Sequence, residues 1–198
     1  MNSFTADVAQ LAAVPVELVH LVVLVEDKRF WTHPGVDALG MARALLRCVK
    51  AGRIAEGGST IPEQLLKMGR PRARRTLRER AVRAANSLAL VGITDRQSLL
   101  RRYLASVYMG RNYYGASAAA RGYFAIDAID LRPAQSFFLA ERIAAPNRFN
   151  AMRIANILAR HDVSETLGAD SENLPGVYGR FYGPAAASQL ERILGDNL

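Results

Sequence analysis

The chain alternates between apolar stretches and polar breaks in a way that predicts helices rather than strands. The segment from Leu18 to Val25 is apolar apart from His20, and it follows Pro15, a residue that suits the first turn of a helix. On length alone this segment also fits a buried strand. Few segments elsewhere show the period of two that marks half-buried strands, so the pattern favours a mainly α protein.

Caps and breakers place the remaining helices. A glycine suits the end of a helix, a proline suits its start, and Ser or Thr caps its first turn. Residues 163–176 are rich in Gly, Ser and acids, which is typical of a loop. The predicted helices are residues 36–52, a helix capped by Ser59 or Thr60, residues 76–91 with a break at Gly92, residues 94–109 with Thr94 and Gln97 as a capping box, and residues 133–145 with Pro133 at the start.

Composition narrows the class of protein. Half of the 198 residues are hydrophobic, which is enough for a substantial core in a chain close to single-domain length. Cys48 is the only cysteine, so the sequence excludes a disulfide framework and a multi-cysteine metal site. Its apolar neighbours favour a buried thiol. The three histidines, at positions 20, 33 and 161, lack metal-ligand spacing, and we predict no metal site.

The net charge of +8 is unevenly distributed. Residues 70–83 hold seven arginines and one glutamate, which favours an anionic partner such as a phosphate group, an anionic lipid or a nucleic acid. Nucleic-acid binding by such a run would use interleaved aromatic residues for stacking, and none lies between Gly69 and Arg102. Residues 161–198 carry six acids against two arginines, which predicts a separate, more polar segment.

Two stretches could carry chemistry. The apolar run ends in Glu26 and Asp27 within VEDKRFWTHPGVD, and a carboxylate at the rim of a core is partly desolvated, which suits a general base. Taken alone, an acid in this place is more often a surface residue. The GGST stretch at residues 57–60 precedes a predicted helix whose amide groups could hold a phosphate together with Gln64 and Lys67. On its own, GGST also fits a simple helix cap.

The order of these stretches resembles a known family. EDKRFWTHPGVD, EGGSTIPEQLLK, RTLRERAVRA, YLASVYMGRNYYG and LAERIAAPNRFN are similar, in this order, to motifs of the peptidoglycan glycosyltransferases, the family 51 transglycosylase domains that polymerise lipid II. The resemblance runs from about Pro15 to Arg160. It predicts a glycosyltransferase-like domain at residues 1–160 and a C-terminal extension at 161–198 that could pack on it. It implies a lysozyme-like, two-lobed helical fold with a smaller, membrane-facing jaw subdomain.

The resemblance also implies a reaction and the residues for it. A glycan chain would move from undecaprenyl pyrophosphate onto the sugar 4-hydroxyl of an incoming lipid II, with inversion. Glu26 matches the family's general base. Residues expected at the substrate and its pyrophosphate are Ser59, Thr60, Gln64, Lys67, Arg80 and Arg83, and residues expected in structural roles are Asp27, Phe30, His33, Gly35, Asp37 and Glu141.

Four positions depart from the family pattern. Glu63 stands for a glutamine, and Ala105 and Met68 stand for asparagines. Arg83 stands where the family has a second functional glutamate, near which a divalent metal, Mg or Mn, is usual. An arginine reverses the charge there, so it could stabilise the leaving diphosphate itself and make a metal unnecessary. Equally, it could mark a site that binds its ligand without turnover.

Four functions remain to be compared. The first is an active, metal-sparing glycosyltransferase, and the second is a non-catalytic homologue that binds lipid-linked glycan or a cell-wall synthesis partner. A nucleic-acid-binding domain is disfavoured, and a lysozyme-like, glycan-cleaving enzyme fits the fold but not GGST.

The implied partners are lipid II, the nascent glycan strand, a membrane surface and cell-wall synthesis proteins, with no nucleic acid. The resemblance implies the outer face of the bacterial inner membrane. The sequence shows no signal peptide or membrane-spanning stretch, so it also allows a cytoplasmic protein.

Overall fold

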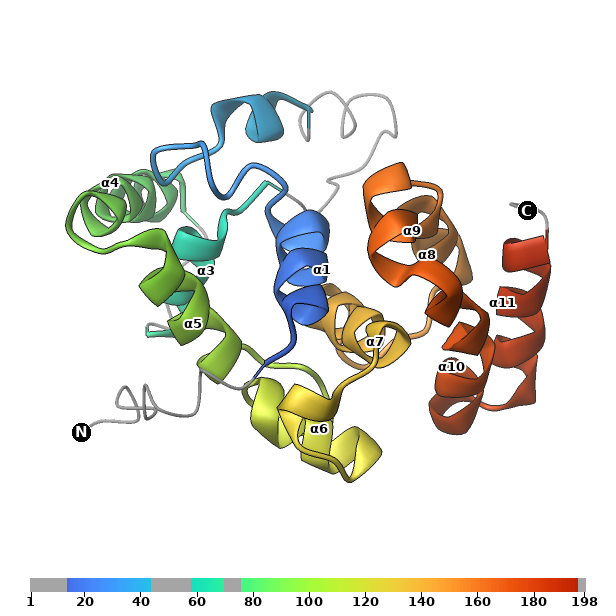
Figure 1. Cartoon of the computed structure of the whole chain (residues 1–198). Coiled ribbons are helices and arrows are strands. Elements are labelled where there is room, and N and C mark those ends of the chain that lie inside the picture. Colours follow the sequence, from blue (N-terminus) through green and yellow to red (C-terminus); the bar gives the residue numbers. More distant parts are fainter. Residues whose placement is uncertain (1–13, 44–57, 70–75, 196–198) are drawn as a thin grey trace. The chain divides into compact units, whose positions relative to one another are not determined.

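The described part of the chain is built from helices. The computed structural model describes residues 14–43, 58–69 and 76–195 (Figure 1). Several predictions concern positions outside the described residues, namely Cys48, Gly52, Gly57 and residues 70–75. Within the described stretches, the only β pairing is an isolated bridge between Tyr108 and Tyr114. The predicted mainly α class is therefore confirmed.

The chain divides into two compact units. One combines Met1–Glu26 with Leu104–Leu198, and we call it the terminal unit. The other is Asp27–Tyr103, which we call the inner unit. Residues 161–198 lie in the terminal unit, together with the helices that precede them.

The terminal unit is organised around one buried helix, α7. Residues Ser136 to Arg142 of α7 are all buried, and α1, α9 and α10 pack against this helix (Figure 1). Helices α10 and α11 run side by side. The elements of this unit are α1 (Val16–Glu26), α6 (Ala116–Phe124), a 3-10 turn η2 (Ala128–Asp130), α7 (Pro133–Ala144), α8 (Ala151–Leu158), α9 (His161–Leu167), a 3-10 turn η3 (Gly168–Asn173), α10 (Leu174–Tyr182) and α11 (Pro184–Gly195).

The apolar run near the N-terminus forms α1, so its helical interpretation is confirmed and the strand alternative is wrong. Leu18, Leu21 and Val22 are fully buried at the spacing of one helix face. His20 is exposed on the other side of the helix. The same α1 ends at Glu26, the first of the two adjacent acids.

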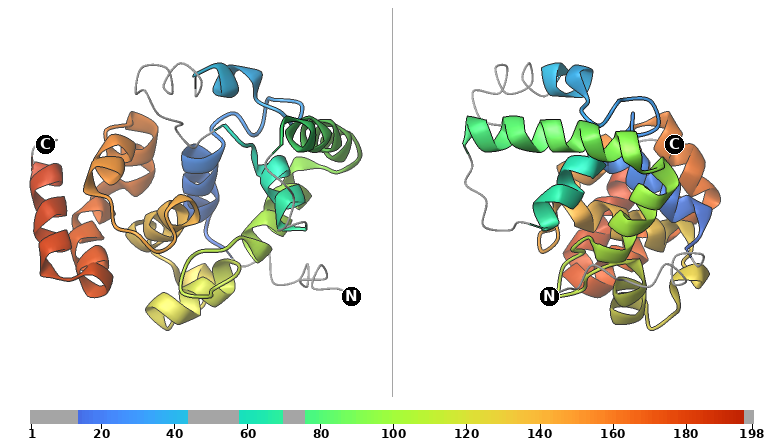
Figure 2. Two further views of the ribbon diagram at one scale, coloured as in Figure 1. Left: turned by 180° about the vertical axis from the view of Figure 1, so that it is seen from behind. Right: turned by 90° about the vertical axis from the view of Figure 1, so that its left-hand side faces the viewer.

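The inner unit consists of helices and the loop at residues 27–37. Its elements are a helical segment at residues 38–43, α3 (Ile61–Met68), α4 (Leu77–Ile93) and most of α5 (Arg96–Ser106). Helix α4 packs against α3 (Figure 2). The loop at residues 27–37 precedes the first helical segment and carries most of the first sequence motif.

Three sequence-based boundaries are wrong. The predicted loop at residues 163–176 is helical, because Val163, Leu167 and Leu174 are buried and bring α9, η3 and α10 onto the core. Helix α4 continues through Gly92, since a single glycine weakens a helix without ending it. The side chain of Asp95, rather than Thr94, caps α5 by accepting a hydrogen bond from the Ser98 amide at 2.8 Å.

Two of the predicted helices exist, but the bounds of one are wrong. The helix predicted at 94–109 ends at Ser106, and the helix predicted from Pro133 begins there. In the stretches that the structure describes, no helix combines the length and apolar character that crossing a membrane requires.

Candidate active site

Glu26, the candidate base, is the last residue of α1 and is half-buried. The buried face of α1 packs on α7, which fixes the helix within the terminal unit. Glu141 lies in the same unit, on α7. All the other predicted site residues belong to the inner unit, where the structure brings several of them into direct contact.

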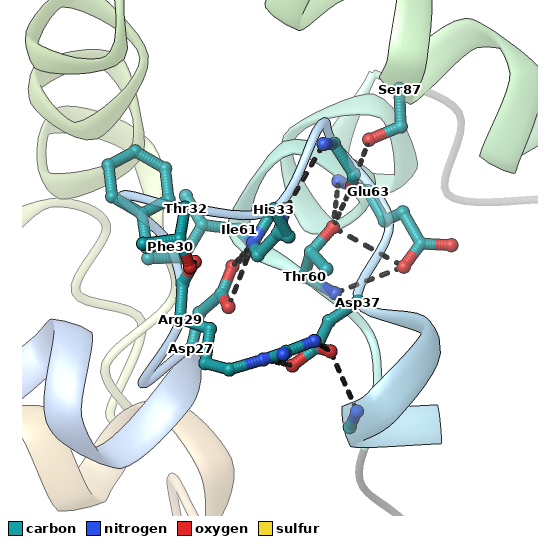
Figure 3. Close-up of polar contacts among 12 residues, drawn as sticks. Asp27, Arg29, Phe30, Thr32, His33, Asp37, Thr60, Ile61, Glu63 and Ser87 are labelled. Atoms are coloured by element: carbon teal, nitrogen blue, oxygen red, sulfur yellow. Dashed lines mark hydrogen bonds and ion pairs between the residues drawn. The ribbon is translucent and has the colours of Figure 1, made fainter. Parts of the chain in front are cut away.

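Asp27, the residue after Glu26, is buried and fully engaged in hydrogen bonds (Figure 3). Its Oδ2 accepts a bond from the Ile61 amide at 2.9 Å and another from His33 Nε2 at 2.9 Å. Burial raises the pKa of Asp27 above its ordinary value, and the Ile61 amide and His33 offset part of that effect. Asp27 therefore ties the first motif to the first residue of α3.

His33 is held in one tautomer by its two neighbours. Its Nδ1 accepts a hydrogen bond from the Gly35 amide at 3.0 Å, so Nε2 carries the proton that is donated to Asp27. Its ring is buried and meets the Phe30 ring edge to face, with centroids 6.4 Å apart. His33 thus links the start of the 27–37 loop to its middle.

The Gly35 carbonyl joins three parts of the inner unit. It accepts one hydrogen bond from Thr60 Oγ1 at 2.6 Å and a second from Ser87 Oγ at 2.7 Å. Gly35 has a φ of +121°, and a Cβ at this position would lie 2.6 Å from the Ser87 carbonyl oxygen. Only glycine fits both constraints. Ser87 is fully buried on α4 and was not among the predicted residues.

Thr60 and Glu63 form the N-terminal cap of α3. Thr60 Oγ1 accepts from the Glu63 amide at 3.4 Å, and Glu63 Oε2 accepts from the Thr60 amide at 3.0 Å. The choice between Ser59 and Thr60 is thereby settled in favour of Thr60 as the cap. Thr60 is 2% exposed, whereas Ser59 is exposed, so the two hydroxyl groups face different surroundings.

Gln64 is oriented by a buried tyrosine. Tyr103 on α5 is fully buried, and its hydroxyl donates to Gln64 Oε1 at 2.8 Å. Gln64 is half-buried, and Lys67, one turn further along α3, is exposed. Tyr103 therefore holds the amide of a predicted binding residue from within the inner unit.

The 27–37 loop is also held by an ion pair between Arg29 and Asp37 and by Arg96 on α5. Arg29 Nε donates to Asp37 Oδ2 at 3.1 Å, and this bond lowers the pKa of Asp37. Asp37 Oδ1 also accepts from the Gly40 amide at 2.7 Å. From α5, Arg96 donates to the carbonyls of Phe30 and His33, the latter at 2.5 Å. The loop is thus bound at its start, middle and end.

Two of the predicted basic residues, Arg80 and Arg83, lie three positions apart on α4. Arg80 is exposed and Arg83 is half-buried. Arg83 offers a cation and no metal-ligating atom. Among the residues that the structure describes, no three or more His, Cys, Asp or Glu side chains come together as metal ligands. Arg83 therefore does not fit as a ligand of the divalent metal that the resemblance implies near this position, and we derive no step through that metal.

Glu141 is fully buried in the terminal unit and is bonded to Arg142, the next residue along α7. Tyr178 on α10 lies 3.4 Å from Glu141 Oε2, and Arg153 Nε lies 3.5 Å from Oε1. Burial and the Glu141 charge raise the pKa of Tyr178 well above its ordinary value, so its hydroxyl stays protonated. Glu141 is therefore engaged entirely within its own unit.

Comparison with known proteins shows a family and several relatives to which this chain is similar. The transglycosylase family matches residues 2–166. The biosynthetic peptidoglycan transglycosylase of Alcanivorax borkumensis is 38% identical over 130 residues, which are 65% of this chain and 53% of the relative. Penicillin-binding protein 1A of Aquifex aeolicus is 33% identical over 137 residues, 69% of this chain and 19% of the relative. Penicillin-binding protein 1B of Haemophilus influenzae is 31% identical over 151 residues, 74% of this chain and 19% of the relative.

The chain thus spans about a fifth of the length of the penicillin-binding proteins that it matches and about half of the shorter relative. The family match begins before α1 and ends within α9. It covers the 27–37 loop, α3, α4 and Glu141, whereas α10 and α11 lie beyond it.

Proposed function

This chain belongs to the transglycosylase family, and we propose that it is a peptidoglycan glycosyltransferase that polymerises lipid II and releases undecaprenyl pyrophosphate. The family and its relatives support glycosyl transfer in peptidoglycan synthesis in general. The substrate, the leaving group, the inverting course and the residue roles below are parts of the proposal.

The observation that carries the proposal is the bond between Asp27 and α3. Asp27 follows Glu26 in the chain, and its carboxylate accepts the Ile61 amide at 2.9 Å. This bond links the segment after the candidate base directly to the N-terminal end of α3, next to Ser59. The α3 amides suggested for an anion are already used, because Ile61 donates to Asp27 and Glu63 to Thr60. We therefore assign the contact with the pyrophosphate of a lipid-linked sugar to side chains around this end of the helix, the exposed Ser59 among them.

In the proposed reaction, the Glu26 carboxylate takes the proton from the 4-hydroxyl of the incoming lipid II. The hydroxyl oxygen forms a bond to the anomeric carbon of the donor sugar from the face opposite the leaving group. The bond between that carbon and the diphosphate oxygen breaks, which inverts the anomeric configuration. General-base catalysis of this kind contributes about 10²–10⁴-fold to a rate.

The diphosphate gains negative charge as its bond breaks, so fixed cations beside it lower the barrier. We assign this role to Lys67, Arg80 and Arg83, with Ser59 and Gln64 as hydrogen-bonding groups. Thr60 was expected to contact substrate, but its hydroxyl already donates to Gly35 and accepts from Glu63. We therefore assign Thr60 to holding the N-terminal end of α3 in place.

A second candidate is a homologue that binds lipid-linked glycan without turnover. The observation that favours it is Arg83, which replaces the acid that the resemblance implies with a cation. Both candidates place the protein at a membrane surface on the outer face of the inner membrane, with lipid II, the glycan strand and cell-wall synthesis proteins as partners. They differ only in whether the protein forms the glycosidic bond between the sugars or binds its ligand without reaction.

Polymerisation of lipid II by the purified protein tests the proposal. We expect glycan strands from the wild type, and a loss of about 10²–10⁴-fold for Glu26→Gln. Glu165→Gln, a change in an acid on α9 whose side chain is 76% exposed, is the matched control and should keep full activity. Equal rates for Glu26→Gln and wild type would refute Glu26 as the base. Lipid II binding without product by the wild type would select the second candidate.

A further inference from the structure

The C-terminal turn of α1 contains Glu26, so whatever holds that turn also holds the candidate base. Helix ends are the weakest part of a helix, because the carbonyls of the last four residues have no amide partner further along it. In α1 these carbonyls include the one of Leu24, two residues before Glu26. The last turn of α1 contains no basic residue of its own to bond them.

Arg160, at the junction of α8 and α9, supplies a donor. Its Nη1 donates to the Leu24 carbonyl at 2.8 Å, across 136 residues of sequence but within the terminal unit. Its Nη2 lies 3.3 Å from the Asp162 carboxylate, which holds the guanidinium from the side of α9. The Arg160 side chain is 30% exposed, so these two bonds, and not burial alone, hold its guanidinium in place.

The backbone of Arg160 is as firmly placed as its side chain. Its amide donates to the Ile157 carbonyl at 3.2 Å, and its own carbonyl accepts from Val163 and Ser164 at 3.0 Å each. Val163 is fully buried, which fixes the start of α9 on the core. The guanidinium thus contacts α1 from a backbone position that hydrogen bonds hold in place within the terminal unit.

We propose that Arg160 is a positioning residue for Glu26. Its hydrogen bond holds the last turn of α1 in helical geometry, and its charge complements the negative end of the helix dipole. Both effects hold the backbone of Glu26 in place, and so the position from which its side chain extends. This inference rests on the proposed role of Glu26 as the base, and no contact of Arg160 with substrate is part of it.

Three variants test the inference in the full chain. Arg160→Gln removes the charge, and Arg160→Lys keeps a cationic donor. Arg121→Gln is the control, because Arg121 is a 71% exposed arginine of the same unit that pairs with Asp127. Two measurements are made on each, the steady-state kinetics of lipid II polymerisation and hydrogen exchange at the amides of Val25 and Glu26.

We expect Arg160→Gln to lower kcat by up to about 10²-fold, since a displacement of about 1 Å at a catalytic group can have an effect of that order. KM should stay within about twofold, because substrate-binding residues are untouched. Arg160→Lys should recover most of the loss, and Arg121→Gln should match the wild type. Exchange at Val25 and Glu26 should be faster in Arg160→Gln alone.

The exchange measurement needs no activity, so the two proposals can fail separately. Unchanged exchange in Arg160→Gln would overturn the inference, whether or not the protein polymerises lipid II. An unchanged kcat in an active protein would overturn it as well. An inactive wild type with faster exchange in Arg160→Gln would refute the proposed function and support the structural hold of Arg160 on the turn that carries Glu26.

Discussion

Each unit contains a buried acidic side chain with a basic partner, Asp27 with His33 and Glu141 with Arg142, and these two pairs are built differently. Asp27 in the inner unit faces His33, which is neutral in the tautomer that accepts from Gly35, and it also accepts a backbone amide. Glu141 in the terminal unit faces Arg142, which is always charged. Both members of the second pair are 0% exposed.

The surroundings of the two pairs differ as well. The Arg142 guanidinium lies 5.3, 5.9 and 5.0 Å from the ring centroids of Phe138, Tyr178 and Tyr182. It is surrounded by aromatic rings, whereas Asp27 is surrounded by polar loop and helix-cap groups. A charged pair in an apolar core depends on each partner, because either one left alone is an uncompensated charge. An acid that accepts backbone amides loses only part of its support when one partner goes.

The largest expected effect is therefore in the terminal unit. Arg142→Met should lower the free energy of unfolding by about 3–5 kcal/mol, because it removes the buried cation bonded to Glu141 and leaves only the partly exposed Arg153 near that carboxylate. Urea unfolding measures the loss. The double variant Glu141→Gln with Arg142→Met should recover most of it, since no unpaired charge remains.

Arg153→Met is the matched control for this prediction. Its guanidinium also faces Glu141, at 3.5 Å, but its side chain is 36% exposed. It should cost less than about 1 kcal/mol. A double variant as unstable as Arg142→Met would show that packing, and not the charge pair, dominates in this cluster.

A smaller effect is expected for Asp27→Asn in the inner unit. The amide nitrogen of asparagine would face a hydrogen-bond donor, either His33 Nε2 or the Ile61 amide, which costs about 2 kcal/mol. Urea unfolding at neutral pH measures this loss. Asp130→Asn, in an exposed acid of η2, is the control and should leave stability unchanged.

The pH dependence of this difference has a definite sign. Because the pKa of Asp27 is raised, the folded protein holds its proton more tightly than the unfolded chain, whose pKa is near 3.8. Ionisation of Asp27 therefore opposes folding. The advantage of the wild type over Asp27→Asn should be largest below the unfolded pKa and should shrink as pH rises through the folded pKa. An advantage that grows with pH over this window would contradict the raised pKa.

The smallest expected change in stability comes from a comparison of two buried serines, one from each unit. Ser87→Ala removes the donor to the Gly35 carbonyl and should cost about 1 kcal/mol. Ser136 on α7 is equally buried, but its hydroxyl has no hydrogen-bond partner among the described residues, so Ser136→Ala should be neutral or slightly stabilising. Thermal unfolding of both variants distinguishes them. Equal losses would show that the bond to Gly35 contributes nothing.

The sequence predicts the parts of the site whose partners are close along the chain. Asp27, His33 and Asp37 lie within one motif, and α1 has a clear apolar face. The sequence pattern predicted a loop at residues 163–176, because the three buried apolar residues there are separated by small and acidic ones.

Long-range partners could not be predicted, because a serine or tyrosine inside a helix carries no local signal of what it meets. Ser87 bonds Gly35 across 52 residues, Tyr103 bonds Gln64 across 39, and Tyr178 lies near Glu141 across 37. Arg160, which contacts Leu24 across 136 residues, is the extreme case. These contacts follow from the three-dimensional path of the chain.

The Gly35 carbonyl, which accepts two hydrogen bonds, also bears on the order of folding. Its two donors come from positions 25 and 52 residues away, so each bond forms only after the segment of its own donor has been placed against Gly35. Bringing such distant segments together lowers the entropy of the chain before the contacts between them can stabilise the fold. The junction is thus expected to form after the folding transition state, and loss of the Ser87 bond should appear mainly as faster unfolding. The contacts of Gly35 would then form late in the folding of the inner unit.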